Sequence, residues 1–129
     1  MAELIHLTEG VVRITSVSDA QLPYSAVDVL RFDSLDILIS AGFESPDGSQ
    51  TLVLKLLSGT QRASTDGWIT SSVSPEVSLK GGVVVQQASW TVSSPSAPLF
   101  RYVRWQVYGF SGATAAYFRI DAIGRKIGG

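Results

Sequence analysis

Few side chains in this 129-residue chain could carry out catalytic chemistry. The chain contains no Cys and a single His, His6, so thiol nucleophiles, disulfides and cysteine- or histidine-rich zinc sites are excluded. Neither a Gly-x-Ser-x-Gly motif nor a Gly-rich phosphate loop with a following helix accompanies His6. We therefore expect a packed or surface histidine, a protein that is not an enzyme, and no cofactor.

The aspartates show no catalytic or metal-binding spacing. Asp33 and Asp36 are three residues apart, which places them on opposite faces of a strand. Asp28 and Asp47 could add oxygens for a calcium ion, as in some jelly-roll modules, but no calcium-loop spacing is present. We predict neither a carboxylate pair for acid–base catalysis nor a metal site.

Aromatic and arginine side chains alternate with apolar ones in two segments near the C-terminal end. In 101–108, Val103, Trp105 and Val107 share one face, and in 116–121, Ala116, Phe118 and Ile120 share one face. The loop 109–114 has the length of a hairpin connection, so the two segments are predicted to form an antiparallel hairpin. Its other face and loop tip would carry the candidate binding residues Tyr102, Arg104, Tyr108, Phe110, Tyr117 and Arg119.

Three interpretations of this face stay open. Aromatic residues and arginine on a rigid sheet anchor protein interfaces, because they offer a large contact area at a modest entropy cost. The same tyrosine rings could stack on sugar rings. The face could also be a cross-strand ladder that stabilises its own sheet, with Arg104 paired to Asp121 or stacked on Tyr117.

The rest of the chain repeats the strand pattern. Leu35, Ile37 and Ile39 alternate with polar residues, as do Leu52, Leu54 and Leu56, and the turn signal at 45–48 predicts a second hairpin between these segments. Leu38, Val53 and Leu57 lie on its outer face, either as a packing layer or as an interface. Further strands are predicted over 11–17, from 66 to before Pro75, over 77–80 and over 83–92, the last at an edge or with a bulge at Gln86–Gln87.

This pattern of about eight or nine short strands predicts an all-β antiparallel β-sandwich, with a jelly roll favoured over a closed barrel. Little or no helix is expected beyond a possible turn over 26–31. We predict a single β-sandwich domain over 11–125, an N-terminal arm or edge strand over 1–10, and a tail over 126–129. Within the arm, the candidate binding residues are Leu4, Ile5, His6 and Leu7.

Composition limits the partners. Ten basic and eleven acidic residues give a net charge of −1, which argues against nucleic-acid binding through a basic surface. No targeting segment and no membrane-spanning segment is expected. Charged residues make up 16% of the chain and apolar residues 45%, which fits either a neutral β domain or a surface partly covered by copies of itself or by a partner.

The order of segments 35–39, 51–57, 66–68, 99–107 and 118–125, with Arg101-Tyr102-Val103-Arg104-Trp105 at its centre, resembles the small β-sandwich virion proteins of tailed bacteriophages, of the kind that decorates or stabilises a capsid. The resemblance covers about residues 30–125 and brings no catalytic residues. It implies a homo-oligomer, often a trimer, made in the host cytoplasm and docked on the major capsid protein at the virion surface. The arm 1–7 would then reach a neighbouring subunit.

Capsid decoration is therefore the function we predict from the sequence. A carbohydrate-binding or adhesin module that uses Tyr102, Tyr108 and Tyr117 is the alternative, and a phage tail or baseplate component with the same fold is a third possibility. Glycans are a possible partner only if the chain is a carbohydrate-binding or adhesin module.

Overall fold

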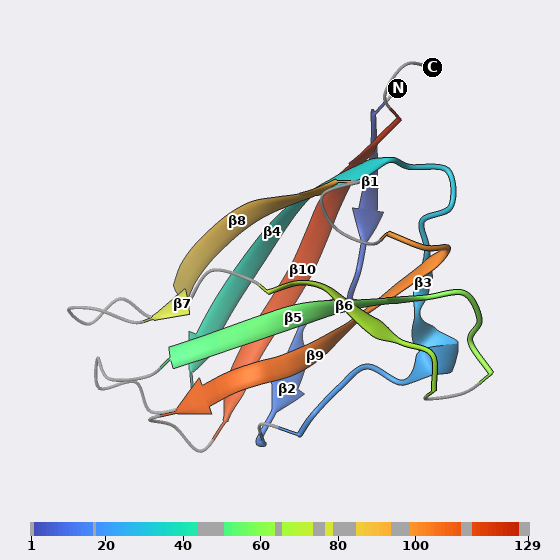
Figure 1. Ribbon diagram of the computed structural model, residues 1–129. Helices are drawn as coiled ribbons and strands as arrows, with labels where there is room; N and C mark the ends of the chain where they lie inside the picture. Colours follow the sequence, from blue (N-terminus) through green and yellow to red (C-terminus); the bar gives the residue numbers. More distant parts are fainter. Residues whose placement is uncertain are drawn as a thin grey trace.

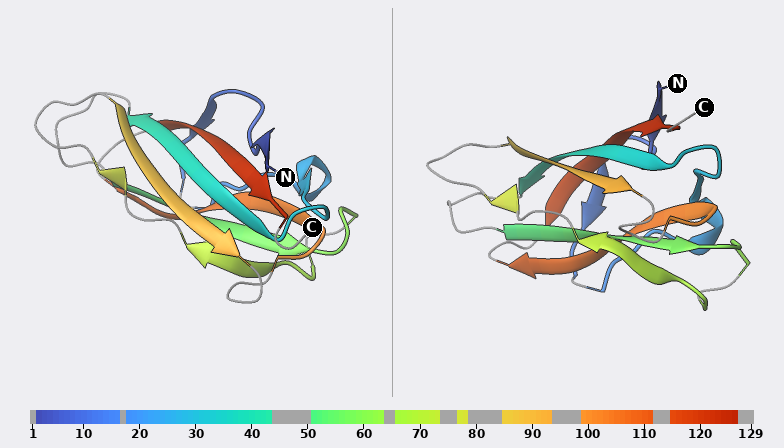
Figure 2. Two further views of the ribbon diagram at one scale, coloured as in Figure 1. Left: turned by 90° about the horizontal axis from the view of Figure 1, so that it is seen from above. Right: turned by 45° about the horizontal axis from the view of Figure 1, so that its top comes forward.

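The structure, a computed structural model, describes residues 2–16, 18–43, 51–63, 66–73, 77–78, 85–93, 99–111 and 115–126. Two antiparallel sheets lie face to face and enclose the core between them (Figures 1 and 2). The predicted β-sandwich is confirmed. Ten strands are found in the described part of the chain, against the eight or nine expected.

The first sheet, sheet A, has the order β1-β10-β4-β8, and β2 pairs with β10 on the same side as β1. Its strands are β1 (Ala2–His6), β2 (Val12–Ile14), β4 (Ser34–Phe43), β8 (Val85–Ser93) and β10 (Ala116–Arg125). Because β1 and β10 pair from Ala2 with Arg125 to His6 with Asp121, the two ends of the chain leave the sandwich side by side (Figure 1).

The second sheet, sheet B, has the order β3-β9-β5-β6, with β7 also paired to β5. Its strands are β3 (Val27–Asp28), β5 (Thr51–Gly59), β6 (Ile69–Val73), β7 (Val77–Ser78) and β9 (Tyr102–Ser111). One 3-10 turn, η1 (Pro23–Ser25), precedes β3. Within the described ranges, no helix reaches the length and apolar character that crossing a bilayer requires.

The strand pairs are nested, as expected for a jelly roll. β1 and β2 pair with β10, β3 with β9, β4 with β8, and β5 with β6. A long antiparallel ribbon wound in this way sends most consecutive strands to opposite sheets. The two long-strand hairpins predicted from the sequence are therefore wrong: β4 and β5 lie in different sheets, and so do β9 and β10.

The predicted inward faces are correct, because side chains alternate across a strand whatever its partner is. Val103, Trp105 and Val107 of β9 are buried, and the inward residues of β4, β5 and β10 are buried with them. Trp105 and Phe118 meet edge to face across the sandwich, with ring centroids 4.9 Å apart and planes at 87°. Each of these two residues comes from a different sheet.

One end of the core requires a glycine. Gly124 in β10 faces Phe32, and a Cβ atom at Gly124 would come within 2.6 Å of the Phe32 ring. Phe32 therefore closes the core at this end only because position 124 has no side chain. Its outer surface is covered in turn by Arg31, whose guanidinium carbon lies 4.5 Å from the ring centroid.

Other expectations were met in part. The segment 26–31 contains β3 instead of a helical turn, and the one helical turn lies just before it, at η1. β8 is an edge strand, as Gln86–Gln87 indicated, and its pairing with β4 runs without a bulge. β1 and β2 follow one another along β10. The turn signal at 45–48 and residues 112–114 of the predicted hairpin loop lie outside the described residues.

The corrected pairing can be tested by cross-linking, since the chain has no Cys to interfere. Thr51 and Ser111 are opposite each other on β5 and β9, with their hydroxyl oxygens 2.6 Å apart. The double variant Thr51→Cys/Ser111→Cys should form an intramolecular disulfide on mild oxidation, because the Cα atoms of directly opposed antiparallel residues are about 4.5–5.5 Å apart, within the range that a disulfide spans. Gel mobility with and without reductant, followed by peptide mass mapping, measures the bond.

A hairpin closed by the loop 109–114 would instead place Gln106 opposite Tyr117. These residues lie in different sheets, so Gln106→Cys/Tyr117→Cys should stay reduced under the same conditions. Efficient cross-linking of this second pair without cross-linking of the first would overturn the jelly-roll pairing.

Candidate functional site

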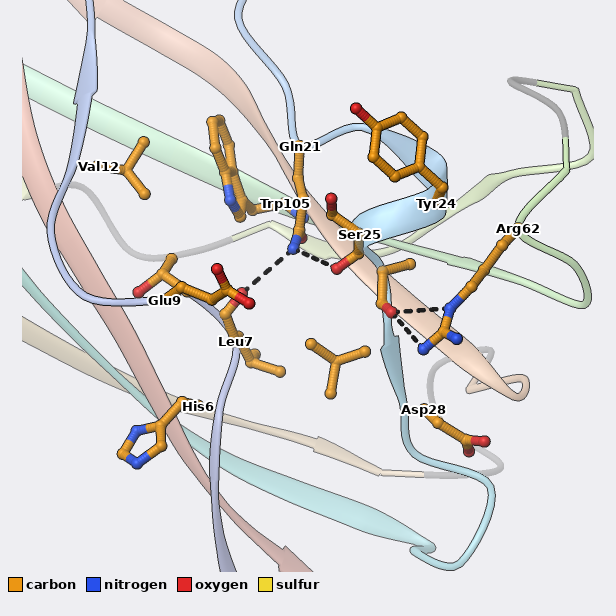
Figure 3. Close-up of a pocket in the computed structure, with 13 residues that line it drawn as sticks. His6, Leu7, Glu9, Val12, Gln21, Tyr24, Ser25, Asp28, Arg62 and Trp105 are labelled. Atoms are coloured by element: carbon orange, nitrogen blue, oxygen red, sulfur yellow. Dashed lines mark hydrogen bonds between the residues drawn. The ribbon is translucent and has the colours of Figure 1, made fainter.

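A groove of about 590 Å³ lies on the side of the sandwich where β1 and β2 of sheet A come near β3 of sheet B. One wall is the chain between β1 and β2, and the other comprises residues 21–28 and Arg62 (Figure 3). Trp105 of β9 contributes to its floor. A cavity of this size is in the range of small-molecule sites. The lining includes His6, Leu7, Thr8, Glu9, Val12, Gln21, Tyr24, Ser25, Ala26, Val27, Asp28, Arg62 and Trp105.

Gln21 ties the two walls of this groove together. Its side-chain amide donates to the carbonyl oxygen of Ser25 at 2.8 Å and to that of Leu7 at 3.4 Å (Figure 3). Its side-chain oxygen accepts the backbone N–H of Trp105 at 3.2 Å, and its own N–H donates to the Trp105 carbonyl at 3.0 Å. One side chain thus connects the β1–β2 wall, the η1 wall and the floor, and the groove has a defined shape without a ligand.

The groove combines aromatic surface with polar groups. Tyr24 is 70% exposed at the rim, whereas Trp105 is 7% exposed in the floor. Glu9 and Ser25 are exposed on the two walls. His6 lies at the sheet A end, where its Nδ1 atom is 2.6 Å from a carboxylate oxygen of Asp121. These are groups that recognise a ligand by stacking and hydrogen bonding.

The contacts of Asp28, at the β3 end of the groove, favour the ionised form of its carboxyl group. Asp28 accepts a hydrogen bond from the Leu30 N–H at 3.0 Å and one from Arg101 Nε at 3.1 Å. These two contacts, the Leu30 N–H foremost, lower the pKa of Asp28 against the opposing effect of burial. A carboxyl group held ionised in this way does not serve as a general acid near neutral pH. Among the described residues, no three His, Asp or Glu side chains gather in a manner suited to a metal ion.

The candidate face predicted from the sequence is divided between opposite surfaces. Tyr102, Arg104 and Tyr108 point outward from sheet B, whereas Tyr117 and Arg119 point outward from sheet A. Because β9 and β10 belong to different sheets, these residues cannot form a single site. Phe110, expected at a loop tip, lies within β9 and packs partly buried against the core, so that expectation was wrong.

On sheet B, two of the predicted binding residues make internal contacts instead. Arg104 is 9% exposed; its guanidinium lies 4.9 Å from the Trp68 ring and donates through Nη1 to the Gln21 carbonyl at 2.8 Å. Burial lowers the Arg104 pKa. The predicted pairing of Arg104 with Asp121 or Tyr117 is therefore wrong. Leu57, opposite Arg104 on β5, is buried as well, so part of this outer face is a second packing layer.

Tyr102 and Tyr108 differ in how much of the ring is free. Arg62 and Arg101 lie 4.4 and 5.2 Å from the Tyr102 ring centroid and cover it. Tyr108 is 61% exposed and has the Lys55 ammonium 5.8 Å from its ring centroid. Tyr108 is thus the predicted sheet B residue that remains most accessible.

Sheet A carries the other predicted residues on a broad outer face. Tyr117 borders a shallow apolar hollow of about 360 Å³ whose floor includes Gly42. Arg119 also lines this hollow and pairs through Nε with Asp121 at 3.0 Å. A smaller hollow of about 130 Å³ lies beside Leu4 and Leu38 on the same face.

The predicted N-terminal arm is the edge strand of sheet A. Ile5 and Leu7 belong to the core at 7% and 2% exposure, whereas Leu4 is 59% exposed on the outer face. His6 pairs with Asp121 as described above. Every residue of β1 pairs with β10, so in this structure the strand completes its own sheet.

Of the residues that line the groove, His6 and Leu7 were predicted as binding residues within the arm, and the others were not predicted as a site. Glu9, Gln21, Tyr24 and Arg62 come from three separate connections and follow no periodic pattern. Trp105 was predicted as a core residue, which is correct for most of its surface. The Leu22-Pro23-Tyr24 sequence is a turn with an aromatic residue, and it is the one local signal that could have indicated an exposed ring here.

Comparisons with known proteins support the fold of the chain but identify no family for it. No protein-family model matches the chain, and no curated protein matches it significantly. A solved structure described as "CBM4 structure and function", a carbohydrate-binding module, is 17% identical over 91% of this chain and 73% of its own, with a TM-score of 0.52. A Bacillus protein described under "Bacillus endospore appendages form a novel family of disulfide-linked pili" is 12% identical over 98% of this chain and 88% of its own, with a TM-score of 0.37. The first likeness supports the β-sandwich fold, and the second is too weak to add to it.

The role of Gln21 leads to a stability prediction. Gln21→Ala should lower the free energy of unfolding by about 1–3 kcal/mol, because the Trp105 N–H and the Ser25 carbonyl lose their partner. Urea denaturation followed by tryptophan fluorescence measures this loss. Gln106→Ala is the matched control: Gln106 is half-buried on β9, in a bridge to Ala20. A Gln106→Ala loss as large as that of Gln21→Ala would contradict the bracing role of Gln21.

Proposed function

We propose that the protein is a non-enzymatic binding module whose groove accepts a carbohydrate. The observation that carries this proposal is the groove itself, in which the exposed Tyr24 and the mostly buried Trp105 share a cavity with Glu9, Ser25 and His6. A sugar ring presents apolar C–H groups on its faces and hydroxyl groups around its edge. A cavity lined by both aromatic and hydrogen-bonding groups complements both features.

The shape of the groove supports the same proposal. Gln21 fixes the walls by hydrogen bonds to the backbone, so little chain entropy is lost when a ligand enters. The neighbour of similar fold is described as a carbohydrate-binding module. A shared fold does not by itself transfer a function, so the proposal depends on the groove.

A glycan array, followed by calorimetry on the sugars it identifies, tests the proposal with two tyrosine variants. Tyr24→Ala should weaken binding by about tenfold or more, since it removes a stacking surface worth at least about 1.4 kcal/mol. Tyr108→Ala is the matched control, because Tyr108 is similarly exposed, at 61% against 70%, but lies on the outer face of sheet B. Both variants should unfold at the wild-type urea concentration.

Two results would contradict the proposal. One is the absence of binding to any class of sugar. The other is binding that is lost in Tyr108→Ala and kept in Tyr24→Ala, which would move the glycan site to sheet B.

A second candidate function is capsid decoration, which the sequence resemblance implies. The observation that favours it is the outer face of sheet A and its edge, which expose Val11 at 68%, Leu4 at 59% and Leu38 at 40% around two shallow hollows. Exposed apolar surface that is interrupted by small hollows suits contact with another protein. On a lattice of identical sites, many such weak contacts act together.

Under this second proposal the protein self-associates, with a trimer favoured, and docks on a major capsid protein. Light scattering at increasing concentration should detect oligomers of the wild type, and Leu38→Asp should shift them to monomers. Ile69→Asp, at a position 44% exposed on sheet B, is the control and should leave the oligomers intact. A wild-type monomer at the highest concentration, or equal effects of both variants, would contradict self-association through sheet A.

A further inference from the structure

The end of the groove at β3 carries more positive than negative charge. Arg62 lines the groove there beside Asp28, and Arg101 reaches the same carboxylate from the start of β9. Both guanidinium groups lie over the ring of Tyr102. Two cations therefore face one anion in this cluster, which leaves one positive charge in excess.

Asp28 forms its ion pair with Arg101, whereas Arg62 acts on the carboxylate only through space. The ion pair joins Arg101 Nε to Asp28 at 3.1 Å, and the other carboxylate oxygen accepts the Leu30 N–H at 3.0 Å. Arg62 instead donates twice to one backbone carbonyl, that of Ala26, through Nε at 3.0 Å and Nη2 at 2.7 Å. A carbonyl oxygen holds the guanidinium in place without cancelling its charge.

The contacts of Arg62 also fix its orientation. The two hydrogen bonds to Ala26 and the Tyr102 ring at 4.4 Å define both the position and the plane of the guanidinium. A guanidinium has five N–H groups, and among the residues that the structure describes none accepts a hydrogen bond from Nη1 of this exposed side chain. A planar fork of this kind matches a carboxylate, which it binds through two parallel hydrogen bonds.

We propose that the groove selects an acidic sugar, with the sugar carboxylate at Arg62 and the hydroxyl groups toward Glu9 on the opposite wall (Figure 3). This inference rests on the proposed carbohydrate function and narrows its ligand to carboxylated sugars. Glu9 provides a carboxylate acceptor for hydroxyl donors, and its charge disfavours the reversed orientation. The opposite charges on the two walls thus favour one orientation of the ligand in the groove.

Matched ligands test the inference on the wild-type protein. Calorimetry would compare a short oligogalacturonate with its methyl ester, which keeps the ring and hydroxyl groups but has no charge. A second arm would compare sialyllactose with lactose, so that uronic and sialic acids are distinguished as the source of the carboxylate. We expect the acid to bind about tenfold or more tightly than its neutral counterpart in one of the two arms, with the difference decreasing as salt is added.

Variants then assign the selectivity to Arg62. Arg62→Gln should abolish the difference between acid and neutral ligand while the neutral ligand still binds, and Arg62→Lys should retain part of it because the charge stays but the planar fork is lost. Arg31→Gln is the matched control. Arg31 also stacks on an aromatic ring, that of Phe32, and pairs with Glu3. It does not line the groove and reaches Asp28 only at the backbone carbonyl, at 3.5 Å, so this variant should keep the full difference.

The outcomes separate the inference from the function on which it rests. Neutral sugars that bind as tightly as their acidic counterparts would overturn the acidic preference and leave the carbohydrate function standing. Failure of every sugar to bind would overturn both. The wild-type comparison decides the inference even where Arg62→Gln loosens the loop that Arg62 anchors to Ala26.

Discussion

The contact between Trp105 and Phe118 is the interaction on which both the sandwich and its groove depend. It joins sheet B to sheet A at the centre of the core. Trp105 also lines the groove, and its backbone N–H and carbonyl both bond to Gln21. Any change in the spacing of the sheets would therefore move the floor of the groove and the residue that braces its walls. The groove is thus an extension of the core packing.

The same contact explains which parts of the fold the sequence could predict. Inward and outward faces follow from a period of two within each strand, which is a local property, and so Trp105 and Phe118 were both correctly assigned to the core. Strand partners are not local. The short connection after β9 fits either a hairpin within one sheet or an arch between two, and the apolar alternation on both sides is the same in either case. The nested order of the jelly roll decides between them, and it requires an arch.

For the candidate site too, the local features could be predicted from the sequence, and the contacts between distant residues could not. Tyr102 and Arg104 have the residue types of an interface, but Arg62 and Trp68 already cover them in the folded chain. Those contacts join positions about forty residues apart, and no pattern in the sequence indicates them. The groove has the same origin, since Glu9, Tyr24 and Arg62 come together only once the two sheets are closed. Tyr102 was predicted as a binding residue. In the structure its ring instead packs against the Arg62 guanidinium and helps to orient it beside the groove.

The pairing of Ala2 with Arg125 has a consequence for how this domain can be connected to other chains. Because its first and last strands are neighbours, a short linker between them would close the chain into a ring, and new termini could then be opened in a distant loop with every strand pair kept. For the same reason the whole domain could be spliced into a loop of a host protein, which would hold it by a two-stranded stalk. The groove lies at the opposite end of β1, beside His6, and would stay free in either arrangement.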